Sequence, residues 1–224
     1  MIFKIFRRII FIFISFTVFW VILYKYVNPP ITYLMISRIV QHDKKVYGEF
    51  KFKKKWVKLN DISPNMILAV VAAEDNNFMN HYGIDWDAIN KARKINKHSR
   101  IKHGASTISQ QTAKNVFLFP SRTWIRKGLE LYFTFLIEIF WGKKRIMEVY
   151  LNVVELGYGI YGVESASKYY FNKSASNLNC SESAMLAAIL PSPIKRNPLH
   201  PSKYLLARRD QIISLMNKIG KVDF

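Results

Sequence analysis

An apolar run near the N-terminus constrains this chain more than any other sequence feature. Sixteen uncharged and mostly apolar residues, Ile9 to Tyr24, lie between Arg8 and Lys25. As a helix they would extend roughly 24 Å at about 1.5 Å per residue, slightly less than the ~30 Å hydrocarbon core of a bilayer. Because the flanking basic side chains can reach outward to the headgroups, we expect one thin membrane span. The sequence predicts that residues 1–27 form a cytoplasmic N-terminus and a transmembrane signal anchor.

The alternative for this segment is a cleaved signal peptide. No small-x-small cleavage motif precedes Asn28, so the sequence favours an uncleaved anchor. Lys4, Arg7 and Arg8 favour a cytoplasmic N-terminus, although the basic residues after the span act in the opposite direction. This orientation would place the rest of the chain on the outer, periplasmic side of the plasma (inner) membrane.

Net charge and cysteine content limit the function classes. The chain has 34 Lys and Arg against 15 Asp and Glu, a net charge of +19, which favours a polyanionic partner such as nucleic acid, an anionic membrane or a phosphorylated substrate. No DNA-reading helix or aromatic RNA platform stands out, so we expect no nucleic acid. Cys180 is the single cysteine, which excludes an internal disulfide and a multi-cysteine metal site but leaves other metals open.

Residues 28–62 have the composition of a linker and docking segment. Pro29-Pro30 should end the preceding helix. The stretch Lys44–Lys58 partly alternates basic and apolar residues, which predicts one or two short strands close to anionic headgroups. A solvated basic surface explains the same stretch equally well.

From Ser63 onward the periodicity is mostly helical. Ser63-Pro64 is typical of a helix start, and Met66–Ala73 is apolar throughout, as in a buried helix. The helix leads into Glu74 and Asp75, and Asp85 should cap the next helix over 86–91. A carboxylate at the end of a buried helix is partly desolvated, which raises its pKa toward the range useful for proton transfer. A solvated turn is the simpler alternative.

A second candidate site lies in the segment Gly104–Asn115. Thr107 and Gln110 have capping-box spacing, and the free N–H groups of a helix start attract phosphate. Lys114 follows Gln110 by one turn on the same face. An ordinary capped helix after a solvated loop is the alternative. Basic residues precede the segment at Lys91, Arg93, Lys94, Lys97, Arg100 and Lys102.

A third candidate is the start of an apolar helix over Arg126–Trp141. Arg126 and Glu130 are four residues apart, so a surface ion pair is the simplest interpretation. The run is too short to span a membrane, and a core helix is the default. With Phe117–Phe119 and Trp124 it could instead form a patch resting in the outer leaflet.

Taken together, these segments resemble the membrane-anchored peptidoglycan glycosyltransferases, which polymerise lipid II. The resemblance covers roughly residues 63 to 216, with mild departures at Ala105, Ser109 and Met147. The matching segments are Glu74, 106–115, 126–130, 144–152 with the glycines from Gly157 to Gly162, 170–173 and 208–216.

The resemblance implies a mostly α, lysozyme-like, two-lobed glycosyltransferase domain over 63–224. Glu74 matches the family's general base, which takes the proton from the GlcNAc 4-hydroxyl of lipid II as that oxygen attacks the growing lipid-linked chain. Glu130 matches a second glutamate that assists near the pyrophosphate, directly or through a divalent cation such as Mg²⁺ or Mn²⁺. No obligatory cofactor is implied, and other cell-wall synthesis proteins are possible partners.

Further residues match positions around these two glutamates. Glu148 is expected to be structural, holding the segment 150–152, and Gly157–Gly162 to be a packing turn. The positions that shape the base's surroundings are Asp75, Phe78 and His81. Those that line the sugar and pyrophosphate sites are Ser106, Thr107, Gln110, Lys114, Asn115, Arg126 and Lys127.

Two alternatives concern the reaction and the domain content. A lysozyme-like hydrolase would also place a glutamate in a sugar groove, but it needs no cations for a leaving pyrophosphate. Ser99-Arg100-Ile101-Lys102 and Ser192-Pro193-Ile194-Lys195 fit the S-x-x-K pattern of transpeptidases, but no K-T-G follows. We therefore expect a monofunctional glycosyltransferase.

Overall fold

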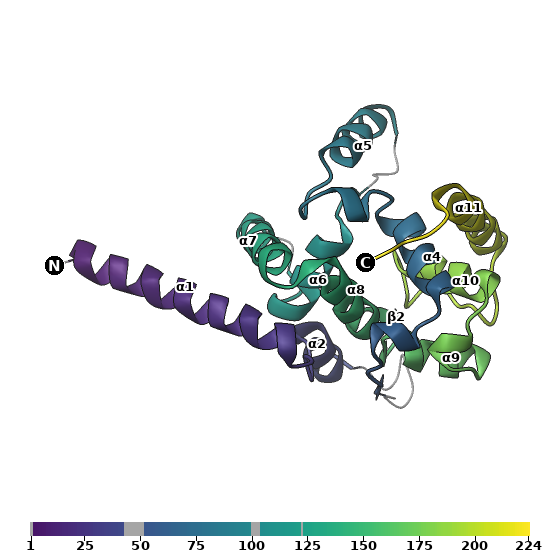
Figure 1. Cartoon of the computed structure of the whole chain (residues 1–224), viewed down its shortest axis with the longest axis horizontal. Coiled ribbons are helices and arrows are strands. Elements are labelled where there is room, and N and C mark those ends of the chain that lie inside the picture. The colour runs from purple at the N-terminus through teal and green to yellow at the C-terminus, as the bar shows by residue number, and fades with distance from the viewer. Residues whose placement is uncertain (1, 43–51, 100–103, 122) are drawn as a thin grey trace.

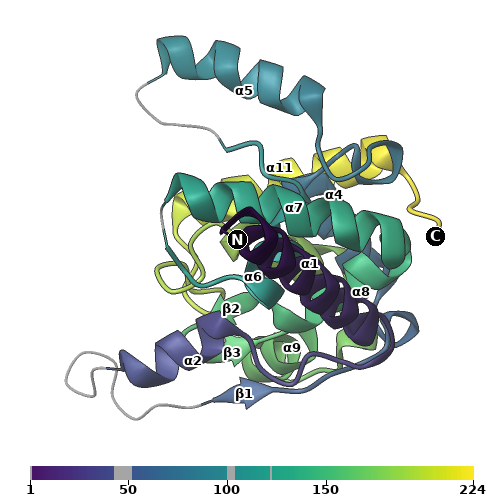
Figure 2. The same ribbon diagram turned by 90° about the vertical axis from the view of Figure 1, so that its left-hand side faces the viewer.

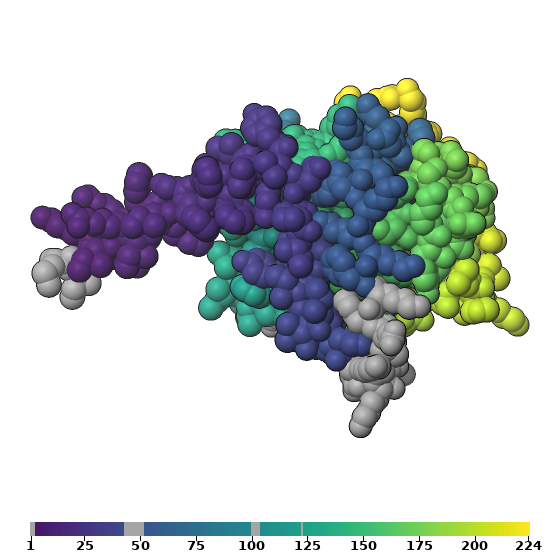
Figure 3. Space-filling view, turned by 90° about the horizontal axis from the view of Figure 1, so that it is seen from below, coloured from purple at the N-terminus to yellow at the C-terminus, as the bar shows by residue number. Residues whose placement is uncertain are grey.

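The computed structural model describes residues 2–42, 52–99, 104–121 and 123–224. The fold is mostly helical, and a long N-terminal helix, α1 (Ile2–Tyr26), projects from the globular domain (Figures 1 and 3). Within the described residues, the segment Phe3–Tyr26 is long and apolar enough to cross a membrane. Its 24 residues extend about 36 Å, so the helix continues beyond the basic residues that flank the apolar run. The predicted fold class and apolar helix are confirmed.

The C-terminal half of α1 packs against α7 (Trp124–Phe140), as Figure 2 shows. The Thr17 hydroxyl lies 2.7 Å from the Tyr132 hydroxyl. The indole Nε1 of Trp141 donates to the Val21 carbonyl oxygen at 2.8 Å. These contacts join the helix to the domain along its last turns, so its direction is fixed relative to the rest of the protein.

The described parts of the segment 28–62, residues 28–42 and 52–62, dock closely on the domain. They include a helix that the sequence did not predict, α2 (Tyr33–Val40), which is capped by Thr32 and packs on α6 (Ile108–Phe117). Arg38 on α2 forms a bidentate pair with Glu155, both distances being 3.0 Å. Part of the predicted strand region, 43–51, lies outside the described residues.

A small sheet and a 3-10 turn hold the end of this segment. The strand order is β1 (Lys53–Lys54), β3 (Ile160–Tyr161), β2 (Glu155–Gly157), with β1 parallel and β2 antiparallel to β3. Within 52–58, β1 confirms that a short strand forms there. The turn η1 (Leu59–Asp61) follows, and the Leu59 N–H donates to the Glu148 carboxylate at 3.0 Å. The Glu148 carboxylate thus holds η1, and its carbonyl oxygen accepts from Asn152 Nδ2 at 2.8 Å, in keeping with the structural role predicted for it.

Two groups of helices make up the domain (Figure 1), consistent with the predicted two lobes. One group contains α4 (Pro64–Glu74), α10 (Cys180–Ile189) and α11 (Lys203–Ile219). The other contains α6, α7 and α8 (Gly142–Val153). The core of α8 is fully buried at Ile146, Met147, Val149, Tyr150 and Leu151.

Local interactions explain several helix boundaries. Pro64 begins α4 as predicted, but the Ser63 hydroxyl donates to the Leu178 carbonyl oxygen at 2.7 Å and does not cap the helix. Asp85 does cap α5 (Trp86–His98), accepting from the Ala88 N–H at 2.8 Å. This helix is longer than predicted and has no buried residue, and it stands away from the rest of the domain (Figure 2).

The glycine-rich stretch is a packing turn, as predicted. A Cβ at Gly157 would lie 2.5 Å from the Tyr170 hydroxyl, and Gly162, at φ +79°, would place one 2.8 Å from the Asn152 carbonyl oxygen. Only glycine leaves room for these approaches. After the turn come α9 (Val163–Phe171) and η3 (Ala175–Asn177).

Candidate active site

Glu74 is the last residue of α4, and it lines a hollow of about 290 Å³. The hollow lies between the end of α4, the start of α5, the loop before α6, and α11. Charged and polar side chains dominate its wall. They include Glu74, Asp75, Asn77, Ser106, Thr107 and Arg208.

A hydrogen-bonded chain orients the Glu74 carboxylate. The Gln111 Nε2 donates to Glu74 Oε2 at 2.8 Å. The Tyr150 hydroxyl donates to the Gln111 Oε1 at 3.3 Å, which fixes the orientation of the amide. Burial raises the pKa of Tyr150 well above its ordinary value, so this hydroxyl remains a donor. Among the described residues, none donates a hydrogen bond to the second carboxylate oxygen of Glu74, Oε1, so that oxygen is available to accept a proton.

The environment of Glu74 raises the pKa of its carboxyl group. Burial is the largest cause, because the charged form loses water. The hydrogen bond from Gln111 and the positive charges of Arg208 and Lys114 offset part of that increase. The prediction that desolvation at the helix end raises this pKa is confirmed, and it makes Glu74 a suitable proton acceptor.

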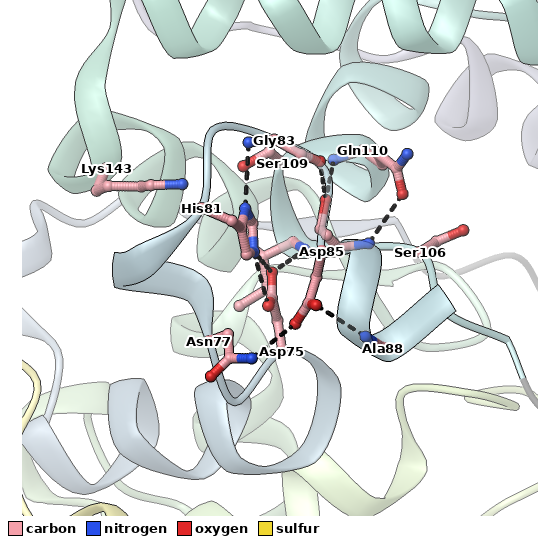
Figure 4. A network of polar contacts seen from close by, with 12 residues as sticks. Asp75, Asn77, His81, Gly83, Asp85, Ala88, Ser106, Ser109, Gln110 and Lys143 are labelled. Atoms are coloured by element: carbon pink, nitrogen blue, oxygen red, sulfur yellow. Dashed lines mark hydrogen bonds and ion pairs between the residues drawn. The ribbon is translucent and has the colours of Figure 1, made fainter. Parts of the chain in front are cut away.

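Asp75 connects the end of α4 to the start of α6, as Figure 4 shows. Its carboxylate lies 2.9 and 3.1 Å from His81 Nε2 and accepts from the Ile108 N–H at 3.0 Å. The Gly83 N–H donates to His81 Nδ1 at 3.1 Å, so Nε2 carries the hydrogen that is donated to Asp75. With 6% of its surface exposed, Asp75 supports the site rather than reacting in it.

The start of α6 differs from the prediction in one respect. The capping box is present: the Thr107 N–H donates to Gln110 Oε1 at 3.0 Å and the Gln110 N–H donates to Thr107 Oγ1 at 3.2 Å. Because Asp75 takes the Ile108 N–H as well, the protein's own side chains occupy most of the helix start. Few N–H groups at this helix start are therefore free to bind a phosphate, and Gln110, only 3% exposed, is a buried capping residue.

A group of cations surrounds Glu130 on α7. Its two carboxylate oxygens lie 2.5 Å from Arg126 NH1 and 2.5 Å from Lys127 Nζ. Glu130 is 3% exposed, so the simple surface ion pair considered for the sequence is wrong. The cluster of Arg126, Lys127 and Glu130 therefore has a buried carboxylate, two partly exposed cations and one excess positive charge.

Lys114 on α6 links the two glutamates electrostatically. Although its side chain reaches solvent, the surrounding protein displaces enough water to lower its pKa. Glu130 and Glu74 both act in the opposite direction, whereas Arg126 and Lys127 lower the pKa further. Lys114 thus lies within electrostatic range of both carboxylates.

The remaining predicted positions differ in exposure. Phe78 is fully buried, and its ring packs edge-on to the His81 ring at 6.4 Å. Asn115 is buried on α6. Ser106 and Thr107 line the Glu74 hollow, and Ser106 is exposed. The structure therefore brings Ser106 and Thr107 to the hollow, whereas the Phe78 side chain lies in the core behind it.

The transglycosylase family model matches residues 43–217 of the sequence. This chain belongs to the transglycosylase family. It is 49% identical to the biosynthetic peptidoglycan transglycosylase of Bacteroides thetaiotaomicron over 219 residues, covering 96% of this chain and 86% of that protein. It is 52% identical to the protein of the same name from Bdellovibrio bacteriovorus over 197 residues, covering 87% and 78% of the two chains.

These relatives confirm the enzyme class predicted from the sequence. The chain is a peptidoglycan glycosyltransferase, and it polymerises glycan chains for the cell wall. A third relative, from Mannheimia succiniciproducens, carries the same name and is 49% identical over 208 residues, covering 93% of this chain and 85% of that protein.

Three residues of this transglycosylase site were not selected from the sequence. Gln111 and Tyr150 orient Glu74, and the Arg208 guanidinium donates to the Ala73 carbonyl oxygen at 3.2 Å on the wall of the hollow. All three lie in the segments that resemble the family. That resemblance was the available signal, but spacing alone assigned them no role.

The residues around Glu130 do not suit a resident divalent cation. Both oxygens of Glu130 already accept from cationic side chains, and a metal ion would be repelled by Arg126 and Lys127. Within the described ranges, no cluster of three His, Cys, Asp or Glu residues could hold a metal ion. We derive no step of the reaction through a metal.

Proposed function

We propose that Glu74 is the general base of glycan polymerisation. Its carboxylate accepts the proton of the GlcNAc 4-hydroxyl of lipid II while that oxygen attacks the anomeric carbon of the MurNAc at the reducing end of the growing chain. The bond from that carbon to the pyrophosphate oxygen breaks, and undecaprenyl pyrophosphate leaves with the bonding electrons. Attack from the opposite face converts the α linkage into a β-1,4 linkage. The observation that carries this proposal is the raised pKa of a carboxylate that lines the hollow.

Three cations would stabilise the leaving group. As the carbon–oxygen bond breaks, negative charge develops on the pyrophosphate, and fixed positive charges stabilise it most in a partly desolvated site. Lys114, Arg126 and Lys127 supply such charges. Glu130 neutralises only one of these three positive charges. A net positive charge therefore remains to stabilise the pyrophosphate.

In this proposal Glu130 is a positioning residue. Its buried carboxylate holds the Arg126 and Lys127 head groups at 2.5 Å, which limits the rotamers that these long side chains can sample. Preorganised cations need little rearrangement during the reaction. Glu130 therefore contributes by fixing charges rather than by exchanging a proton.

The protein is anchored in the membrane in this proposal. The apolar helix α1 supports a single-pass anchor, and we infer a cytoplasmic N-terminus with the catalytic domain outside the plasma (inner) membrane. Trp124 at the start of α7 is 92% exposed, and Ile125 and Phe119 are also exposed. Such residues suit the membrane interface, where the lipid tails of lipid II and the growing chain would lie.

The direct test is polymerisation of labelled lipid II by the purified full-length protein. We expect a polymer that muramidase digestion converts to small fragments. Cleavage of preformed glycan without polymer formation would contradict the proposal and favour a hydrolase.

A further inference from the structure

A second hollow, of about 430 Å³, lies far from Glu74 on the domain surface. It is formed by β1, the β2–β3 turn, α9 and the segment after α10, and shares no lining residue with the Glu74 hollow. In both ribbon views these elements lie at the opposite end of the domain from α5 (Figures 1 and 2). We call it the tyrosine hollow. Its polar wall consists of Lys53, Tyr158, Tyr169, Tyr170, Arg196 and Asn197.

The aromatic wall of the tyrosine hollow is held in place. The Tyr170 hydroxyl donates to the Leu156 carbonyl oxygen at 3.0 Å, and the absence of a side chain at Gly157 makes room for it. Burial raises the pKa of Tyr170 to about 12, so the hydroxyl stays neutral. The Tyr169 ring packs edge-on to Tyr170 with centroids 4.9 Å apart. The rings therefore form a preformed surface.

The charge of this hollow is positive. Lys53 Nζ lies 4.7 Å from the centre of the Tyr169 ring. Arg196 NH1 donates to the Ala188 carbonyl oxygen at 2.6 Å, and its guanidinium lies 5.1 Å from the Tyr204 ring. Within the described part of the chain, neither cation forms an ion pair and no Asp or Glu lines the hollow. Its cations can therefore bind a carboxylate from outside.

We propose that the tyrosine hollow binds the peptide-bearing glycan strand that the enzyme makes. Sugar rings present C–H groups that pack against the faces of Tyr rings, whose electron density attracts them. The stem peptides on MurNAc carry carboxylates, which form charge-assisted hydrogen bonds with Lys53 and Arg196. The volume of the tyrosine hollow lies within the range of roughly 300–1,000 Å³ that is typical of small-ligand sites. A concave site of this size can enclose a saccharide, whereas the flat surface of a partner protein would not fill it.

This inference rests on the polymerase function and adds a second point of attachment. A strand bound at both hollows dissociates more slowly than one bound at the Glu74 hollow alone, because release from one site leaves it tethered at the other. The tyrosine hollow should therefore lengthen the product without changing the chemical step.

The test uses full-length protein and the variants Lys53→Glu and Tyr169→Ala. Lys195→Glu is the matched control, because it makes the same charge reversal beside Arg196 on an exposed residue outside the hollow. The binding probe is the disaccharide–peptide fragment released from peptidoglycan by muramidase. Product length and the initial rate of lipid II consumption are measured in parallel.

We expect Lys53→Glu to weaken fragment binding by about tenfold and to shorten the polymer, with the initial rate within about twofold of wild type. Tyr169→Ala should act in the same direction, and Lys195→Glu should change neither quantity. Unchanged binding in both hollow variants would overturn the inference, as would equal binding of the stem peptide without sugar. If wild-type protein made no polymer, the proposed function itself would fail, which is a separate outcome.

Discussion

Glu74 and Glu130 are both partly or fully removed from water, yet their surroundings are opposite. Glu74 accepts one hydrogen bond, from the neutral Gln111 amide, and burial raises the pKa of its carboxyl group. Glu130 has a cation within 2.5 Å of each oxygen. A carboxylate with a raised pKa and a free oxygen can accept a proton, whereas one paired twice with cations holds them in place. The partners, rather than the residue type, decide the role.

The largest expected effect is that of Glu74→Gln. The amide keeps the shape but cannot accept a proton, and a general base typically contributes about 10²–10⁴ to the rate. We expect polymerisation to fall by at least about 10² with lipid II binding retained, as measured by labelled lipid II turnover and binding. Asp61→Asn, on an exposed carboxylate of η1, is the control and should be neutral. Near-normal turnover of the Glu74 variant would remove it from the mechanism.

Lys114→Ala should have the next largest effect. Removing one group that stabilises charge in a transition state typically costs about 10²–10³ in turnover. If this lysine contacts the pyrophosphate in the ground state as well, as the proposed function implies, kcat should fall and KM for lipid II should rise. Lys114→Arg should recover part of both. If the kinetics of the alanine variant matched wild type, Lys114 would be an ordinary surface charge.

Glu130→Gln should reduce stability more than chemistry. Breaking a buried ion pair on one side leaves uncompensated charge, which typically costs about 3–5 kcal/mol. We expect a clear fall in Tm with a loss of activity that is smaller than for Glu74→Gln. Asp223→Asn breaks the exposed pair with Lys221 and should change stability by less than about 1 kcal/mol. Equal Tm changes for the two variants would contradict the buried role.

The smallest effect concerns pH. Glu74 must be ionised to act, so the rate should fall as the pH drops below its pKa. The hydrogen bond from Gln111 lowers that pKa, because it stabilises the charged form of the carboxyl group. In Gln111→Leu we therefore expect the acid limb of the pH–rate profile to move to higher pH. If the acid limb did not move, Gln111 would have no effect on the pKa of Glu74.

Features encoded by neighbouring residues could be predicted from the sequence. The capping box of Thr107 and Gln110 and the cap at Asp85 were predicted because each depends on residues three positions apart. Glu74 was found because an uninterrupted apolar helix ends there. The buried character of this helix could be inferred from its residues alone.

Features that depend on distant residues could not be predicted. Gln111 is 37 positions from Glu74, and Asp75 is 33 positions from the Ile108 N–H that it occupies. The sequence therefore suggested free N–H groups at the start of α6, since nothing local indicates that Asp75 accepts from the Ile108 N–H. Likewise, the spacing of Arg126 and Glu130 does not indicate that tertiary packing buries their pair.

The central claim is that Glu74 takes the proton while Glu130 holds the cations. A single-turnover measurement with Glu74→Gln and Glu130→Gln, over a range of lipid II concentrations up to saturation, tests it most directly. The account predicts that Glu74→Gln stays slow at every concentration, whereas Glu130→Gln regains much of its rate as lipid II increases. A saturated Glu130→Gln enzyme that is as slow as Glu74→Gln, with both variants folded and binding lipid II, would contradict the account.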